Sequence, residues 1–544
     1  MTTRRSFLAA LITTAAGAQD KHEPWTVYIT PDSCSDFTWN NTAEDTLLAY
    51  AEIIRSHLDE MTRTDGEAPE NRDHYNLSVS GEALSFFNRY PERKDEFIRR
   101  VKEGRIAISP FLNNSLFAFH STESAIRNFY PAVRMQREWG VPLDAAEHIE
   151  CPSMPWGMAP LLAACGVRWL SVPFLDYDSN FKHLEIPPIF VWEGPDGSSL
   201  RMVFDKFASE NGSYSQGAFL LNNPSKIGGE WVPHYESLGD AYPLRFFLAS
   251  GTHNDLYLKS VRQTRPFSDG IRTWNATSGD RVKLVSATLP QFCRAVDEVQ
   301  ERRPFMKRVR GCFGHSWDLW PVTTTKYASG MRTEGSRFLD LEALVTVSSL
   351  AQPKIVEDAR HALSKAEWSW TMLADHAWNG QDEANRKGNS TIRRNWLADL
   401  ERSNDTIANT VWQALELTPK SDSLTVFNPV AFERTGLGRI PVDLTGQSVA
   451  GMPAQIVEED GLRTSYFALK QLRGFELRTF SLVRSAASST LRASDTSLEG
   501  PFYRLRVDPK TGGLASLIHV PSGQELLVPG SARTLCLLVY HDCQ

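Results

Sequence analysis

The sequence contains no hydrophobic run long enough to form a permanent membrane span. No stretch reaches the roughly 18 uninterrupted apolar residues that a transmembrane helix needs, so no stable membrane insertion is expected. Cysteine is also scarce, with seven residues in a chain of 544 and no CxxC pair. Because these cysteines are odd in number and widely separated, disulfide bonds are not expected to be the main source of stability.

An excess of positive charge is absent as well. The chain has 58 Lys and Arg against 65 Asp and Glu, a formal net charge of −7, and no basic patch favours nucleic acid as a partner. A neutral or weakly charged substrate is the better expectation. The sequence also lacks the GxxxxGK[ST], GxGxxG, HExxH and GxSxG patterns, which argues against P-loop, Rossmann, zincin and serine hydrolase chemistry.

The first 18 residues have the pattern of an export signal. Arg4-Arg5 precedes a short apolar run, which ends in the small residues Ala16-Gly17-Ala18. This order of charged, apolar and small residues predicts a twin-arginine signal peptide over residues 1–18 and a periplasmic or extracellular mature protein. A buried N-terminal helix is the alternative.

The rest of the chain changes character twice, which predicts a multidomain α/β, all-α and all-β protein. Over residues 19–305, short apolar strands alternate with amphipathic helices, so we expect a (β/α) barrel-like catalytic domain. Residues 306–418 show only long helical patterns and predict a helical bundle. Residues 419–544 contain short strands separated by Gly, Pro, Asn and Asp. We expect a partial β-sandwich there, either small or truncated, because the strands are too few to close a large one.

Residues that could bind a metal follow the first predicted strand, residues 25–29. An extended chain directs alternate side chains to one side, so Asp32, Cys34 and Asp36 would share a face. Thiolate and carboxylate groups suit zinc or a similar divalent ion. A solvated turn rich in Ser and Asp is the alternative.

Two further polar segments lie at probable strand ends, where α/β proteins build their sites. His148 and Glu150 would point to one side of an extended segment, and Glu150 could be a nucleophile or a metal ligand. Asp255 could donate a proton, with His253 as its local competitor. The alternatives are a surface-loop glutamate and a polar turn, respectively.

Two aromatic-rich segments near the helical region each contain one histidine. His315 is followed by Trp317 and Asp318, and His376 is followed by Trp378 at the end of a long helical pattern. Such segments can supply a metal ligand or a wall on which a sugar stacks. A histidine with a purely structural role is the alternative for both.

Taken in order, these segments resemble glycoside hydrolase family 38, the α-mannosidases, over roughly residues 25–525. The stretch from Asp32 to Trp39 resembles the family's H-x-H-x-D-x-G-W motif. The run Glu150-Cys151-Pro152 resembles the start of its D-x-P-G-x-x-W-G block. The chain departs from the family pattern because Asp32 and Cys34 replace histidines and Glu150 replaces an aspartate.

The resemblance implies a role for each matching residue. Glu150 takes the place of the nucleophile and Asp255 that of the acid/base. Zinc or a similar divalent cation is expected on four ligands, Cys34, Asp36, Glu150 and His315, with Asp32 and Cys151 as substitutes. The residues expected to contact the sugar are Asp32, Trp39, His253, Trp317, Asp318, His376 and Trp378.

The resemblance therefore implies a metal-dependent retaining glycoside hydrolase acting on α-mannosides or related glycans. The added methylene of Glu150 shifts its carboxylate by about 1 Å, and such a shift can cost on the order of 100-fold in rate. One alternative is thus a catalytically weakened glycan-binding protein. The other is a metal-dependent polysaccharide deacetylase, which would release acetate. A carbohydrate is the expected partner in every case.

Overall fold

The computed structural model describes residues 24–150, 152–175, 185–252, 267–417, 420–449, 451–459, 461–484, 490–528 and 535–536 of the chain. The expected signal peptide, Cys151, His253 and Asp255 lie outside the described residues. The chain divides into two units, Met1–Leu339 with Glu357–Asn409, and Asp340–Val356 with Thr410–Gln544. Within the described part of the chain, no helix has both the length and the apolar character needed to cross a bilayer.

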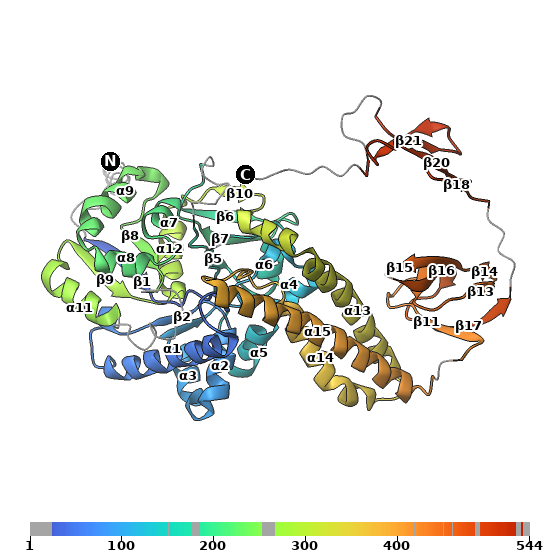
Figure 1. Ribbon diagram of the computed structural model, residues 1–544. Coiled ribbons are helices and arrows are strands. Elements are labelled where there is room, and N and C mark those ends of the chain that lie inside the picture. Colours follow the sequence, from blue (N-terminus) through green and yellow to red (C-terminus); the bar gives the residue numbers. More distant parts are fainter. Residues whose placement is uncertain are drawn as a thin grey trace, which may run out of the picture. The chain divides into compact units, whose positions relative to one another are not determined.

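The first unit contains short, mostly parallel strands surrounded by helices (Figure 1). One sheet has the order β8-β1-β9, and a second has the order β10-β6-β7-β5-β4 with an antiparallel β6–β7 pair; β2 and β3 pair separately. A closed barrel stays a prediction, since the described strands form three separate sheets. The strand bounds are β1 Trp25–Thr30, β2 Tyr75–Leu77, β3 Ile106–Ile108, β4 Ala145–Glu147, β5 Trp169–Ser171, β6 Ile189–Glu193, β7 Ser199–Val203, β8 Phe246–Ser250, β9 Val282–Ser286 and β10 Arg308–Arg310.

The helices of this unit begin and end at residues with local signals. Thr42 caps α1, because its hydroxyl accepts a hydrogen bond from the Asp45 N–H at 3.1 Å, and Gly140 ends α5 with a left-handed φ of 66°. The helix bounds are α1 Ala43–Arg63, α2 Gly81–Arg89, α3 Lys94–Lys102, α4 Thr122–Asn128, α5 Tyr130–Trp139, α6 Met158–Ala164, α7 Lys206–Gly212, α8 Gln216–Asn222, α9 Val232–Ser237, α11 Phe267–Ser278 and α12 Leu289–Arg302.

The core of this unit lies around the two larger sheets. Val27 and Phe247 belong to one cluster of buried apolar residues, and Leu170 and Met202 belong to another. Parallel strands are apolar on both faces, so their polar side chains collect at the carboxyl ends. The segments with the candidate site residues follow two such ends, those of β1 and β4.

Long helices follow the short 3₁₀ segment η7 (Ser316–Thr324). They are α13 (Thr325–Ser349), α14 (Ile355–Met372) and α15 (Glu383–Ala414). From Ser423 onward, the described elements are antiparallel strands. Their bounds are β11 Ser423–Phe427, β12 Arg434–Ile440, β13 Gln447–Val449, β14 Met452–Pro453, β15 Gln455–Glu459, β16 Leu462–Leu472, β17 Leu477–Arg484, β18 Arg492–Ser494, β19 Ser497–Glu499, β20 Tyr503–Val507, β21 Leu514–His519 and β22 Gln524–Glu525. The protein is thus a multidomain mixture of helix and sheet.

Candidate active site

The segment after β1 is held from one side by its serines. The Ser33 hydroxyl donates to Glu82 at 2.7 Å, and Ser35 shares a hydrogen bond of 2.6 Å with the Tyr50 hydroxyl. The chain makes a tight turn at Ser35, where the Asp36 N–H donates to the Cys34 carbonyl at 3.0 Å, and the side chains of Cys34 and Asp36 lie in one buried group.

Glu150 reaches the same place from the segment after β4. Its N–H donates to the Pro173 carbonyl at 2.8 Å, and its own carbonyl accepts from Leu175 at 2.9 Å. Its φ is 69°, a left-handed conformation that is rare for a residue other than glycine. Such strained backbone is found preferentially at functional sites, where the surrounding hydrogen bonds hold it in place.

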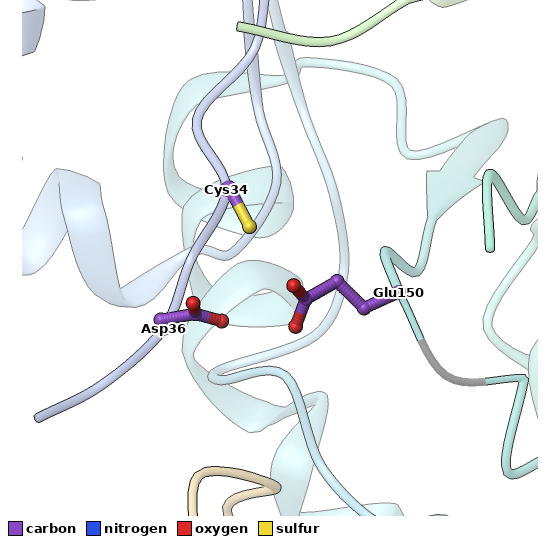
Figure 2. A group of neighbouring side chains, drawn as sticks. All are labelled: Cys34, Asp36 and Glu150. Carbon is purple, nitrogen blue, oxygen red and sulfur yellow. The ribbon is translucent and has the colours of Figure 1, made fainter. Parts of the chain in front are cut away.

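Cys34, Asp36 and Glu150 form one buried group. Their candidate ligand atoms all lie within 4.8 Å of one another. Figure 2 shows the two carboxylates pointing toward each other, with the cysteine sulfur beside the space between them. Burial, and next the charge of Glu150, raise the pKa of Asp36 to about 7, so the group favours positive charge near it.

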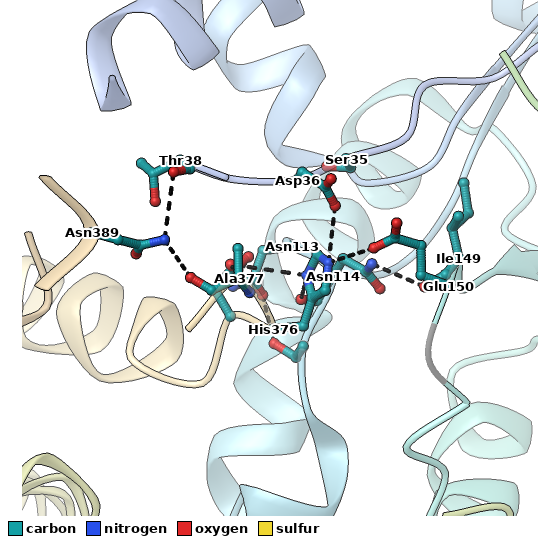
Figure 3. Close-up of polar contacts among 12 residues, drawn as sticks. Ser35, Asp36, Thr38, Asn113, Asn114, Ile149, Glu150, His376, Ala377 and Asn389 are labelled. Atoms are coloured by element: carbon teal, nitrogen blue, oxygen red, sulfur yellow. Dashed lines mark hydrogen bonds and ion pairs between the residues drawn. The ribbon is translucent and has the colours of Figure 1, made fainter. Parts of the chain in front are cut away.

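His376 lies between the two carboxylates (Figure 3). Its Nε2 is 3.0 Å from Oδ1 of Asp36 and 2.9 Å from Oε2 of Glu150, and its Nδ1 donates to the Asn114 carbonyl at 2.9 Å. Burial disfavours a charged imidazole, but the hydrogen bonds to the two carboxylates outweigh it and hold the pKa of His376 well above its usual value. The Nε2 of His376 thus bridges the two carboxylates.

Two residues of α15 hold the segment that presents His376. The buried Arg393 guanidinium donates to the carbonyls of Leu373, Asp375 and Ala377. The buried Asn389 amide donates to the Ala377 carbonyl, to that of Asn379 and, at 3.5 Å, to that of Thr38. Since Thr38 belongs to the segment after β1, Asn389 joins both sides of the site.

Asn114 makes a similar connection from the segment after β3. Its side-chain amide donates to the carbonyl of Ile149 at 3.0 Å, immediately before Glu150. Its backbone carbonyl accepts from both the N–H and the ring Nδ1 of His376. One asparagine therefore connects the segments of His376 and Glu150.

The carboxylates open onto a pocket of about 510 Å³. Its polar floor includes Asp36, Glu150 and His376, and its aromatic lining is Trp39, Trp317 and Trp320. A third side is formed by residues 213–215, two serines and a tyrosine. A volume of this size is typical of sites for drug-sized ligands.

The wall at residues 213–215 is tightly constrained. Ser213 has a φ of 49° and a ψ of −144°, which is strained for a residue with a side chain. Gly251, at a φ of 113°, lies directly against it, and a Cβ at this position would be 2.1 Å from the Tyr214 carbonyl oxygen. This approach explains why glycine follows β8.

The buried donor set fits a divalent metal. A thiol, two carboxylates and an imidazole are all groups that bind zinc, and four ligands of these types match a tetrahedral zinc site. A cation between the carboxylates would also offset the repulsion that raises the pKa of Asp36. The residues able to hold it are Cys34, Asp36, Glu150 and, after loss of its Nε2 proton, His376.

His315 is the fourth ligand expected from the sequence, and that role stays a prediction. Neither His315 nor His376 belongs to the group of three candidate ligands found among the described residues, but His376 contacts both of its carboxylates. Its Nε2 lies 3.3 Å from the Leu175 carbonyl, and its Nδ1 accepts from the Trp317 N–H at 3.3 Å. Backbone groups therefore occupy both ring nitrogens.

The other expected residues differ in their positions. Trp39, Trp317 and His376 line the pocket, whereas Asp32, Asp318 and Trp378 are not among its lining residues. Asp318 accepts hydrogen bonds from Ser153 and from the His315 N–H, and the ring of Trp378 packs on Arg393. His148 lies against the Ser115 carbonyl.

Sequence reasoning missed Trp320, although its spacing of three from Trp317 is a visible signal. Nothing local in the sequence marks Asn114, Asn389 or Arg393.

Comparison with known proteins identifies relatives. The model of the glycosyl hydrolases family 38 N-terminal domain matches residues 24–308, more than half of the chain. An alpha-mannosidase from Enterococcus faecalis V583 is similar, with a TM-score of 0.62 and 16% identity, covering 92% of this chain and 61% of that one. A protein in glycosyl hydrolase family 38 from Enterococcus faecalis gives a TM-score of 0.60 and 15% identity, covering 92% and 59%.

These similarities to solved structures establish the fold. This chain spans less than two thirds of the length of either structure. No curated protein matches it.

Proposed function

The chain belongs to glycosyl hydrolase family 38, and on this basis we propose that it is a metal-dependent glycoside hydrolase that cleaves α-mannosides or related glycans with retention. The observation that carries the proposal is the buried group of Cys34, Asp36 and Glu150, joined by His376, at the floor of an aromatic-lined pocket. A pocket with aromatic faces and a polar floor suits a sugar, which presents both C–H faces and hydroxyl groups.

In the proposed reaction, Glu150 attacks the anomeric carbon and forms a covalent glycosyl-enzyme. Asp255 gives its proton to the leaving oxygen and then takes a proton from the water that releases the sugar. Asp255 lies outside the described residues, so its role rests on the sequence resemblance. The hydrogen bonds on both sides of the Glu150 backbone hold its carboxylate at the pocket floor and limit the misplacement caused by the longer side chain.

A metal would be held by Cys34, Asp36, Glu150 and His376. When bound, such an ion supplies a Lewis acid that grips sugar hydroxyls and stabilises developing charge. His376 then gives up the proton with which its Nε2 bridges the carboxylates, because a ligating imidazole must be neutral. Trp39 packs against the sugar and, with Trp317, excludes water.

The test is a panel of glycosides assayed with added zinc, using the wild type, Glu150→Gln and Asp255→Asn. We expect both variants to lose at least about 100-fold in kcat. Unchanged hydrolysis by Glu150→Gln would reject the assignment of the nucleophile. Acetate release from an acetylated glycan is measured in parallel, because a deacetylase is the alternative enzyme.

A second candidate is a glycan-binding protein without turnover. It is favoured by the glutamate at position 150, since the pocket and its tryptophans could bind a sugar even where the carboxylate is misplaced for attack. Calorimetry distinguishes the two, because a binding protein shows saturable affinity for a mannoside while no monosaccharide is released.

We also propose that the protein is exported through its twin-arginine segment. Fusion of residues 1–23 to a reporter should give export that stops when Arg4 and Arg5 are replaced by lysine. Export that persists in this variant would contradict the proposal.

A further inference from the structure

The pocket contains a row of three parallel rings that leads away from the carboxylates. The ring of Trp317 stacks on that of His376, with centroids 6.0 Å apart and an angle of 18°. The ring of Trp320 stacks on Trp317 in turn, at 4.5 Å and 22°. Since His376 contacts both Asp36 and Glu150, the row begins at the reacting groups.

The local fold explains the row. Both tryptophans belong to η7, a 3₁₀ segment, in which residues three apart lie on the same side. Trp317 is only 8% exposed, whereas Trp320 is half-buried. Leu319, the residue immediately before Trp320, is 67% exposed and does not line the pocket. The row therefore runs from a buried inner ring to an outer ring on the pocket wall.

The size of the pocket indicates more than one sugar. Its volume of about 510 Å³ lies within the range of roughly 300–1,000 Å³ found for drug-sized ligands, which corresponds to a disaccharide better than to a single hexose. The hydroxyl-bearing wall at residues 213–215 provides polar groups in the same pocket as the aromatic wall. A pyranose has polar edges and apolar C–H faces, so it matches this pair of walls.

We propose that Trp320 binds the second ring of an α-linked disaccharide or longer glycan, the ring joined to the sugar that lies over Glu150. This inference rests on the proposed function and assigns it a substrate class, oligosaccharides rather than single sugars with small leaving groups. Trp320 is thereby a specificity-determining residue, and Trp317 supports its ring from the inner side.

The experiment compares two substrates in four proteins. The substrates are an α-linked mannobiose and α-mannosyl fluoride, whose leaving group is too small to reach Trp320. The proteins are the wild type, Trp320→Ala, Trp320→Phe and the matched control Leu319→Ala. For Trp320→Ala we expect kcat/KM on mannobiose to fall about tenfold, equivalent to about 1.4 kcal/mol, with less than about a twofold change on the fluoride. Trp320→Phe should recover part of the loss, and Leu319→Ala should behave as the wild type.

Two outcomes would overturn the proposal: equal losses on both substrates, which would indicate a structural role, or no loss on either. Calorimetry with mannose and mannobiose keeps the test independent of turnover. If the wild type hydrolyses neither substrate, the proposed activity fails. The subsite then stands only if mannobiose binds more tightly than mannose and Trp320→Ala removes that preference.

Discussion

The Nε2 atom of His376 lies 2.9 Å from Oε2 of Glu150, although 226 positions separate the two residues. The contact joins the segment after α14 to the segment after β4, and Asn114 supports it from both sides. The candidate site is complete only when the helical segment has folded against the strands. The predictions below test this arrangement.

Replacing His376 should weaken metal binding far more than replacing His315. We expect His376→Ala to raise the zinc Kd by about 100-fold or more, because even residues that only support a ligand cost 10–100-fold. His315→Ala should change it less than about threefold, since backbone groups occupy its ring nitrogens. Zinc titration against a chelating dye measures both. Strong loss in His315→Ala with none in His376→Ala would restore the ligand assignment made from the sequence.

Replacing Asn389 should damage the site from a distance. Asn389→Ala removes the donor to the part-buried Asn379 carbonyl and one of two donors to the buried Ala377 carbonyl, which keeps Arg393, at a cost of about 1 kcal/mol in the free energy of unfolding. We also expect about a tenfold weaker zinc affinity, because the segment that carries His376 loses its attachment. Lys387→Ala, an exposed change on the same helix, is the control. Lost stability with unchanged zinc affinity would contradict a positioning role.

Glu147 should make the protein less stable as the pH rises. Burial, and next Glu82, raise its pKa to about 8, and both of its carboxylate oxygens lack a hydrogen-bond partner within the described part of the chain. The folded state thus holds a proton that the unfolded state releases near pH 4.5. The contribution of Glu147 to the free energy of unfolding is fully present below pH 4.5 and is lost as the pH rises toward about 8.

Glu147→Gln should remove much of this loss, on the order of 3 kcal/mol between pH 5 and pH 8. Calorimetric melting at the two pH values measures it, with the exposed change Glu138→Gln as the control. Identical pH dependence in the wild type and Glu147→Gln would show that Glu147 is not the group responsible.

Gly251 should tolerate no side chain. In Gly251→Ala the new Cβ would lie 2.1 Å from the Tyr214 carbonyl oxygen, so the pocket wall must move. We expect a loss of about 3 kcal/mol or more in stability and at least a tenfold lower kcat/KM. Gly104→Ala is the control: its φ of 74° is also left-handed, but no atom lies within 4 Å, so the cost should be only about 1 kcal/mol. Equal effects of the two changes would mean that contact with Tyr214 is unimportant.

Several features of this protein are determined by short stretches of its sequence. The family is readable from the order of the motifs, and the match over residues 24–308 confirms it. Thr42 caps α1, and such a cap is readable from sequence because capping depends on a residue and its neighbours within one turn. Cys34 and Asp36 lie in one group, as alternation along the chain predicts, although the chain makes a tight turn at Ser35 between them.

The same alternation overstates Asp32. Asp32 precedes Cys34 by two residues, so alternation places it on the same side, yet it is absent from the group of Cys34 and Asp36. Each residue of an extended chain advances about 3.3 Å, so Asp32 lies two steps back toward β1 and pairs there with Asn76. The side to which a residue points does not specify how far along the strand it lies.

Which histidine joins the carboxylates was decided by tertiary structure. His315 and His376 have similar local surroundings in the sequence, each beside aromatic residues near a helix. Only the folded chain shows that Asn389 and Arg393 of α15 hold the segment of His376, while Leu175 and Trp317 occupy His315. These contacts join residues up to 351 positions apart. Local sequence determines helices, strands and the side to which a residue points, but the distance between two such side chains depends on how separate elements pack.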